Sequence, residues 1–319
     1  MARNKVQFQK GLSEVEFERR YGSEQQCLDQ VIAWRWPEGF ECPQCGGARH
    51  CVIKPSRSYP RGLWQCNACK RQTSPIAGTI FASTKLALTV WFRAMYHMTQ
   101  TKQGISSIEL GRRLGTTQTT AWKIKHKLAQ VMIERDAKKP LQGRVEMDDA
   151  YLGGERSGGK RGRGAAGKLP IITAVETTSD GKPVRLKIRR IKRFTKKQVR
   201  ALTEQIIEKG ATVVTDGLAC FRGVAAAGCT HAPVIVANIV QSQKLSCFKW
   251  ANTTLSNIKS AITGTYRAVR KHAPRTLAEF EYRFNRRYDL TTIIPRLGYA
   301  AVRTPPMPYK LLKLTEDGA

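Results

Sequence analysis

The chain has 319 residues, which is enough for two or three domains with separate hydrophobic cores. It carries 55 Lys and Arg against 24 Asp and Glu, a formal net charge of +31, and the basic residues are spread along its whole length. That surplus implies a polyanionic partner, most simply nucleic acid. No apolar run approaches the roughly 18 residues of a membrane span. The first residues also lack the apolar core of a signal peptide, so we expect a cytoplasmic protein with no membrane partner.

Residues 1–36 are predicted to form an N-terminal helical segment. Apolar residues recur at helical spacing between charged ones from residue 11 to residue 35. Ser13 followed by Glu16 is typical of a capping box, and Ser23 is a candidate cap for a second helix. We interpret the apolar positions as packing and the charged positions as a solvated face.

Cysteine spacing predicts a zinc ribbon over residues 37–76. Two Cys-x-x-Cys pairs flank a basic segment, and four thiolates would close a tetrahedral site around a structural zinc ion. The predicted ligands are Cys42, Cys45, Cys66 and Cys69. The alternative is a redox-active pair, but two matched pairs favour metal. His50 and Cys51 lie between the pairs and are expected not to be ligands.

Residues 84–138 have the pattern of a helix-turn-helix. An apolar helix is followed by a helix that a Ser caps, a turn containing Gly, and a helix rich in small polar and basic residues. The side chains expected at or near the exposed start of the recognition helix, facing DNA, are Thr117, Gln118, Thr119 and Lys123. A plain helical linker is the alternative, and the net charge favours DNA binding.

Residues 140–300 are predicted to form an α/β domain with the order strand, strand, strand, helix, strand. Asp148 lies inside the first, apolar strand, and Asp216 ends the fourth. A carboxylate inside a strand is costly unless a cation compensates its charge. Two carboxylates presented by two strands suit a divalent metal ion. A ribosomal-type or chromatin-coating protein would explain the charge of the chain but not these acids.

A segment rich in Gly, Lys and Arg follows the first of these strands. It lacks the spacing of a Walker or dinucleotide-binding loop, so we interpret it as a flexible loop that contacts the nucleic-acid backbone. Its candidate contacts are Lys160, Arg161 and Arg163.

A helix is predicted over residues 248–262, with a clear apolar stripe. At about 100° per residue, Asn252 and Lys259 lie along one edge of that stripe, so both can border a cleft.

Taken together, these motifs resemble the DDE-type transposases of bacterial insertion sequences, in the branch with an N-terminal zinc ribbon. The resemblance extends from the helix before the ribbon to about residue 290. It rests on the paired cysteines, on Val-Glu-Met-Asp-Asp-Ala-Tyr-Leu-Gly-Gly around Asp148, on Thr-Asp-Gly at Asp216, and on Asn252 followed by Lys259 and Gly-Thr-Tyr. A final match is Glu-Phe-Glu-Tyr-Arg-Phe-Asn-Arg-Arg, which starts at Glu279. The resemblance implies a ribonuclease-H-like catalytic fold and two bound magnesium ions.

The family's catalytic residues are carried over by position. Asp148 matches the first catalytic acid, and Asp149 ranks second because strand alternation turns it to the opposite face. Asp216 matches the second acid. The third is usually a Glu seven residues before a Lys, and here Asn252 occupies that place with Lys259 as the Lys (259 − 252 = 7). Asn252 departs from the commonest pattern, although this branch of the family tolerates Asn in that place. Its neutral amide oxygen is a weaker metal ligand than a carboxylate.

Glu279 is an alternative third acid, but its surroundings are typical of a helix that braces the domain. Arg286 and Arg287 in the same segment are expected to meet DNA phosphates. Residues 301–319, with three prolines up to Pro308, are expected to be a loosely packed C-terminal tail.

The resemblance implies a mechanism of two-metal cleavage and strand transfer at element ends. Asp148 would bridge both ions, Asp216 would hold one and Asn252 would help to position the other. Water, and later a DNA 3′-hydroxyl, would attack phosphorus in line. The expected partners are the terminal inverted repeats and target DNA, bound by a homodimer or larger assembly in the bacterial nucleoid. Two alternatives stay open: an inactive DNA-binding regulator of the same fold, which Asn252 favours, and a nuclease or resolvase without strand transfer.

Overall fold

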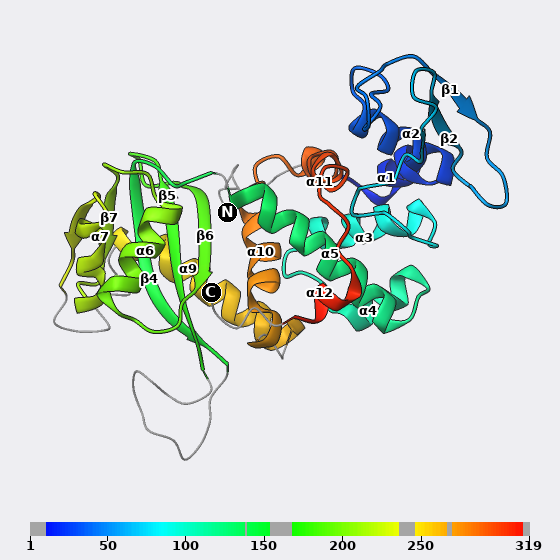
Figure 1. The fold of residues 1–319 in the computed structure, drawn as a ribbon. Coiled ribbons are helices and arrows are strands. Elements are labelled where there is room, and N and C mark those ends of the chain that lie inside the picture. Colours follow the sequence, from blue (N-terminus) through cyan, green and yellow to red (C-terminus); the bar gives the residue numbers. More distant parts are fainter. Residues whose placement is uncertain (1–10, 138, 154–167, 236–245, 267–269, 315–319) are drawn as a thin grey trace. The chain divides into compact units, whose positions relative to one another are not determined.

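The computed structural model describes residues 11–137, 139–153, 168–235, 246–266 and 270–314, and the chain divides into two compact units (Figure 1). The first unit takes its described residues from 11–101, 107–131 and 288–313, and the second takes most of its residues from 132–287. None of the helices in the described ranges is long and apolar enough to cross a membrane.

The first unit contains several helices and a small three-stranded sheet with the order β1-β2-β3. Its elements are α1 (Glu14–Tyr21), α2 (Glu24–Arg35), β1 (His50–Ile53), β2 (Leu63–Cys66), β3 (Gln72–Thr73), α3 (Leu88–Gln100), α4 (Ser107–Leu114), the first part of α5 (Gln118–Ala137), η6 (Leu290–Thr292), α11 (Ile293–Ala301) and α12 (Tyr309–Lys313). Ser13 caps α1 through its hydroxyl, and Ser23 forms a complete capping box with Gln26 at the start of α2. Both serines therefore cap their helices as predicted, but the complete capping box forms at Ser23 and not, as expected, at Ser13.

Helices α2, α3 and α11 form the core of this unit. The indole of Trp34 stacks on the ring of Phe92 with 5.3 Å between ring centroids. Gly298 of α11 lies so close to Trp34 that a Cβ at this position would come within 2.0 Å of the indole. Only a glycine lets α11 pack this tightly on α2.

Helices α4 and α5 are joined by a short turn at Gly115, whose φ of +63° favours glycine. Gly111 of α4 is buried where the two helices meet, and a Cβ there would lie 3.1 Å from the carbonyl oxygen of Thr116.

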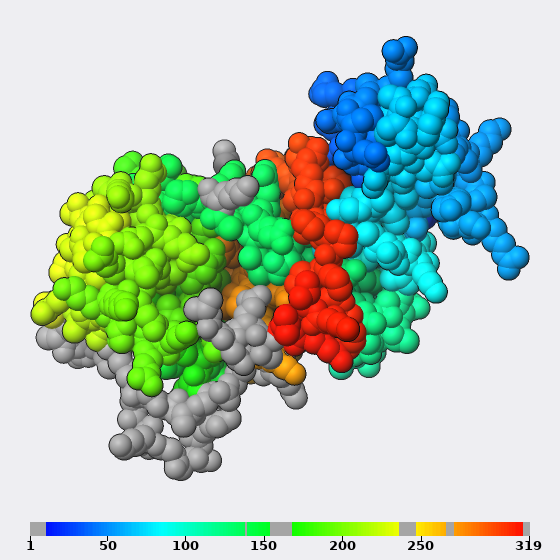
Figure 2. Space-filling model, viewed as in Figure 1, coloured from blue at the N-terminus to red at the C-terminus, as the bar shows by residue number. Residues whose placement is uncertain are grey.

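The C-terminal helix α12 packs on α5, so the described part of the tail is better ordered than expected. The ring of Tyr309 meets Trp122 edge-on, with 6.3 Å between centroids, and Leu312 is fully buried. In Figure 2, the red C-terminal segment lies against the green atoms of α5.

The second unit contains a five-stranded mixed sheet with the order β6-β5-β4-β7-β8. Its elements are β4 (Arg144–Leu152), β5 (Leu169–Thr177), β6 (Pro183–Arg190), α6 (Lys196–Ile206), β7 (Thr212–Thr215), η2 (Ala219–Arg222), α7 (Gly223–Ala226), β8 (Thr230–Pro233), η3 (Ser246–Phe248), α9 (Lys249–Ala261), the π-helical turn η4 (Ile262–Tyr266), η5 (Arg270–His272) and α10 (Ala273–Phe284). Strand β5 pairs antiparallel with both β4 and β6. Strand β7 pairs parallel with both β4 and β8. This is the ribonuclease-H-like arrangement that the resemblance implied, and it keeps the predicted order of strand, strand, strand, helix, strand.

The two faces of this sheet are covered by different helices. Alternate residues of β4, beginning with Val145 and Met147, join α6 in one apolar cluster. The opposite face, with Ala150 and Leu152, packs on α9 and α10. Glu146 and Asp148 fall in this second register, so β4 presents both acids toward the α9 side of the sheet.

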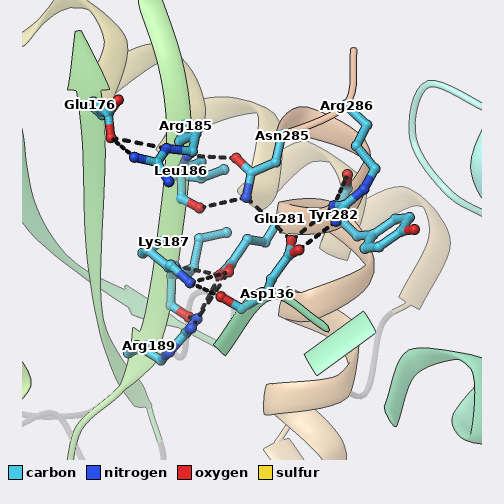
Figure 3. Close-up of polar contacts among 11 residues, drawn as sticks. Asp136, Glu176, Arg185, Leu186, Lys187, Arg189, Glu281, Tyr282, Asn285 and Arg286 are labelled. Atoms are coloured by element: carbon cyan, nitrogen blue, oxygen red, sulfur yellow. Dashed lines mark hydrogen bonds and ion pairs between the residues drawn. The ribbon is translucent and has the colours of Figure 1, made fainter. Parts of the chain in front are cut away.

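The outer edge of β6 is covered by polar side chains of α10 (Figure 3). The amide of Asn285 accepts a hydrogen bond from the backbone N–H of Leu186 at 2.7 Å and donates to its carbonyl at 3.0 Å. Glu281 accepts from the N–H of Ile188 at 3.0 Å. An uncovered edge invites pairing with other chains, and these bonds satisfy it inside the domain.

Arg286 and Arg287 belong to this internal network rather than to an open phosphate-binding surface. The guanidinium of Arg286 contacts Asp136 at 2.6 Å, and the exposed fraction of its side chain is 9%. Arg287 donates to the backbone oxygens of Pro183, Val184 and Phe284. These hydrogen bonds engage both guanidinium groups within the protein, and their contact with DNA stays a prediction.

Candidate metal-binding active site

Three carboxylates converge where β4 and β7 run side by side. Asp148 and Asp149 come from β4, Asp216 directly follows β7, and one oxygen from each lies within 4.8 Å of the others. The parallel register pairs Glu146 with Val214. Two residues further along, the same register brings Asp216 beside Asp148. Because β7 ends there, the edge of β4 is left open to these side chains.

The environment of Asp148 favours its neutral form when no cation is present. Burial, followed by the negative charges of Asp149 and Asp216, raises the pKa of Asp148 to about 7. The N–H of Asp149, which donates to Asp148 Oδ1 at 2.8 Å, and the charge of Lys259 oppose this rise. A divalent cation bound by these carboxylates would offset both the cost of burying the charge of Asp148 and the repulsion from Asp149 and Asp216.

Helix α9 is anchored to β4 by Glu146, which the sequence did not mark as functional. The side chain is 1% exposed, and its Oε2 accepts hydrogen bonds from the N–H groups of Trp250 and Ala251 at 2.9 and 3.1 Å. These N–H groups belong to the first turn of α9, where a carboxylate is favoured by the helix dipole. Arg144 pairs with the other oxygen at 3.0 Å.

This anchor fixes the helix that carries Asn252 and Lys259. Asn252 is half-buried in the second turn of α9, and Lys259 is exposed but close enough to lower the pKa of Asp148. Glu279, the alternative third acid, is fully buried on α10 and pairs with Arg283 at 2.7 Å. The structure therefore gives Glu279 the bracing role expected of its motif, and Asp149 is the third carboxylate of the cluster.

The four predicted zinc ligands also converge. The sulfur atoms of Cys42 and Cys69 are 3.6 Å apart, as are those of Cys45 and Cys66, and all four lie within 4.8 Å of one another. Backbone N–H groups, with Gln44 first, lower the pKa of Cys42 to about 6 despite the opposing effect of burial. Four sulfur donors fit zinc, whereas the oxygen donors of the acid cluster fit a hard ion such as magnesium.

The residues predicted at the recognition helix lie at or near the start of α5. The hydroxyl of Thr117 accepts from the N–H of Thr120 at 3.3 Å, and Gln118 donates to Ser107 at 2.9 Å. Thr119 is exposed, and the ammonium of Lys123 lies 4.5 Å from the ring centroid of Tyr309. Lys160, Arg161 and Arg163 fall outside the described residues.

Two family models match the chain. The transposase zinc-ribbon domain covers residues 22–72, and the ISXO2-like transposase domain covers residues 140–285. The chain carries an ISXO2-like transposase domain preceded by a transposase zinc ribbon. The zinc-ribbon match includes the four converging cysteines, and the transposase-domain match includes the three converging carboxylates, so each cluster lies in the domain that the sequence predicted for it.

A relative also comes from a mobile element. The chain is 26% identical over 218 residues to a protein described as uncharacterized in the transposable element ISH50 of Halobacterium salinarum, covering 64% of this chain and 70% of the relative. That organism is archaeal. A solved structure, described as the crystal structure of a pre-cleavage Mos1 transpososome, aligns over 68% of this chain and 79% of its own with 8% identity. Its TM-score is 0.22, which is too low to support an argument.

Proposed function

We propose that this protein cuts DNA at the ends of an insertion element and joins the ends to a target. The observation that carries the proposal is the convergence of Asp148, Asp149 and Asp216, in a chain with 55 Lys and Arg against 24 Asp and Glu. Carboxylates gathered on two strands suit metal-assisted phosphoryl transfer, and the positive charge suits a DNA substrate.

Asp148 and Asp216 would hold two divalent ions, with Asp149 or Asn252 completing the ligand set. When bound, the ions would activate the attacking oxygen and stabilise the leaving one. Glu146 would act as a positioning residue, since it fixes the first turn of α9 against β4. Lys259 would contact a phosphate near the cut. No covalent bond between protein and DNA is needed, so no Ser or Tyr nucleophile is assigned.

The first unit would recognise the element ends. We infer that α4 and α5 act as a helix-turn-helix, with Thr119 free to approach bases because its side chain is exposed at the start of α5. The zinc ribbon would hold the neighbouring basic segment in shape. Two ends must be brought together, which favours a dimer or larger assembly.

The test is cleavage and joining of a labelled duplex carrying the terminal repeat of the encoding element. Wild type and Asp216→Ala would be compared at equal DNA occupancy, with magnesium or manganese. We expect wild type to nick and join the duplex and the variant only to bind it. Equal binding with no cutting by wild type would support the inactive regulator. Cutting without joining would support the nuclease.

A further inference from the structure

A cationic cavity lies in the second unit, away from the acid cluster. Its volume is about 480 Å³, and its lining comprises Lys168, Leu169, Pro170, Arg190, Ile191, Lys192 and Lys271. Four of these seven residues are basic, and among the described residues that line the cavity none is acidic. Like charges gathered around one cavity repel each other, so an anion placed among them is strongly favoured.

The sheet register relates this cavity to the acids. On β5, Thr173 pairs with Asp148, and Leu169 pairs with Leu152 at the far end of β4. The cavity wall at Leu169 and Pro170 is therefore three to four residues along β5 from the level of Asp148 (173 − 170 and 173 − 169), or about 10–13 Å at 3.3 Å per residue.

Lys271 and Leu169 place part of the cavity wall on the side of the sheet that carries Asp148. Lys271 lies in η5, directly before α10, which packs on that face. Ile191 belongs to the apolar cluster of the other face, so the cavity lies at the end of the sheet. Successive phosphates of one DNA strand advance about 3.4 Å along the helix axis while turning around it, so neighbouring phosphates are about 7 Å apart. A strand whose phosphate lies at the acid cluster therefore reaches the cavity about two nucleotides further on.

We propose that this cavity binds the phosphodiester backbone of the DNA strand being cut, about two nucleotides from the scissile phosphate. Lys192 and Lys271, whose side chains are exposed, supply the charge that meets the phosphates. This proposal rests on the proposed function, because it takes the anion bound in the cavity to be the DNA substrate. The cavity holds the strand in register while α9 and the acids act on the bond.

The test compares two variants of equal charge. Lys192→Gln with Lys271→Gln removes two cations from the cavity. Lys197→Gln with Lys209→Gln removes two exposed lysines on or after α6, which covers the other face of the sheet. Binding of a short fluorescent duplex is measured against salt concentration without divalent metal, so that nothing is cut and the result does not depend on catalysis.

We expect the slope of log affinity against log salt to become shallower by about 0.9 for each phosphate that the cavity variant no longer neutralises, and to stay at the wild-type value in the control. If two phosphates are no longer neutralised, the decline in affinity between about 50 and 200 mM salt shrinks roughly tenfold. Equal slopes in all three proteins, or equally shallow slopes in both variants, would overturn the proposal. So would a cavity variant that fails to bind inorganic phosphate but keeps the wild-type DNA slope, because the cavity would then hold a small free anion.

A second arm tests the register. Single methylphosphonates remove the charge of one phosphate at a time. We expect wild type to be sensitive at about two nucleotides from the cut bond, and the cavity variant to be insensitive there. Sensitivity at the same phosphates in both proteins would refute the assignment. If wild type does not cut at all, the proposed function fails, while the salt slopes still decide whether the cavity binds DNA.

Discussion

Replacing Asp148 by Asn should stabilise the metal-free catalytic unit at neutral and alkaline pH. The folded protein holds the pKa of Asp148 at about 7, against an ordinary value of 3.8. Between these values the folded state binds more protons than the unfolded state, so stability falls as pH rises. The destabilisation is absent below pH 3.8 and complete above pH 7. The full difference corresponds to at most about 4 kcal/mol, at 1.36 kcal/mol for each pH unit.

Asn has nearly the same shape and can still accept the hydrogen bond from the N–H of Asp149, so the change mainly removes charge. We expect wild type to lose stability from pH 4 to pH 8 relative to Asp148→Asn. Adding magnesium at pH 8 should stabilise wild type and leave the variant unchanged. Burial lowers the pKa of His231 and His272, but both titrate in both proteins, so the comparison isolates Asp148.

The assay is urea unfolding read by hydrogen exchange in peptides from β4 and β5, corrected for the effect of pH on intrinsic exchange. These peptides report the second unit alone. Magnesium is omitted rather than chelated, so that zinc stays in the ribbon. If the two proteins show the same dependence on pH, Asp148 is not held among repelling carboxylates and the description of the site is wrong.

Four further substitutions test other parts of the structure. Gly298→Ala should destabilise the first unit by about 3 kcal/mol or more, because the new methyl group overlaps the indole of Trp34. Thermal unfolding measures this loss, with Gly264→Ala as the control because the space around Gly264 is open. Cys66→Ser should abolish the single equivalent of bound zinc, whereas Cys51→Ser, which changes an exposed residue outside the cluster, should keep it by metal analysis. Arg286→Gln should lower the free energy of unfolding by about 3 kcal/mol, since it removes the ion pair of the buried Asp136 carboxylate. Unchanged stability with a weaker salt dependence of DNA binding would contradict a structural role for Arg286. Glu146→Gln should lower the free energy of unfolding by about 2 kcal/mol and slow DNA cleavage without changing DNA affinity. A variant that cuts at the normal rate would show that α9 needs no such anchor.

Features encoded by local spacing could be predicted from the sequence. The two Cys-x-x-Cys pairs specify the ribbon because each pair needs only its own tight turn to present two sulfur atoms. Helix caps at Ser13 and Ser23 are likewise local, and both form as expected. The acids Asp148 and Asp216 could be found because a carboxylate inside or just after an apolar strand is conspicuous.

What the sequence did not reveal depends on contacts between distant residues. Glu146 holds Trp250, 104 positions away, and Arg286 holds Asp136, 150 positions away, so neither role is visible without the fold. Asp149 was ranked behind Asp148 by strand alternation. Nevertheless, one carboxylate oxygen of Asp149 lies within 4.8 Å of oxygens of both Asp148 and Asp216, where β7 ends beside β4.

In the proposed function, metal ions held by the acid cluster act directly on the bond that is cut. The most direct test replaces one non-bridging oxygen of the scissile phosphate by sulfur. Sulfur is a poor ligand for magnesium, and manganese tolerates it better. We predict that the substituted duplex is cut slowly with magnesium and that manganese restores cutting in wild type but not in Asp216→Ala. Equal cutting of the oxygen and sulfur duplexes with either metal, or equal slowing with both, would contradict direct contact between metal and phosphate.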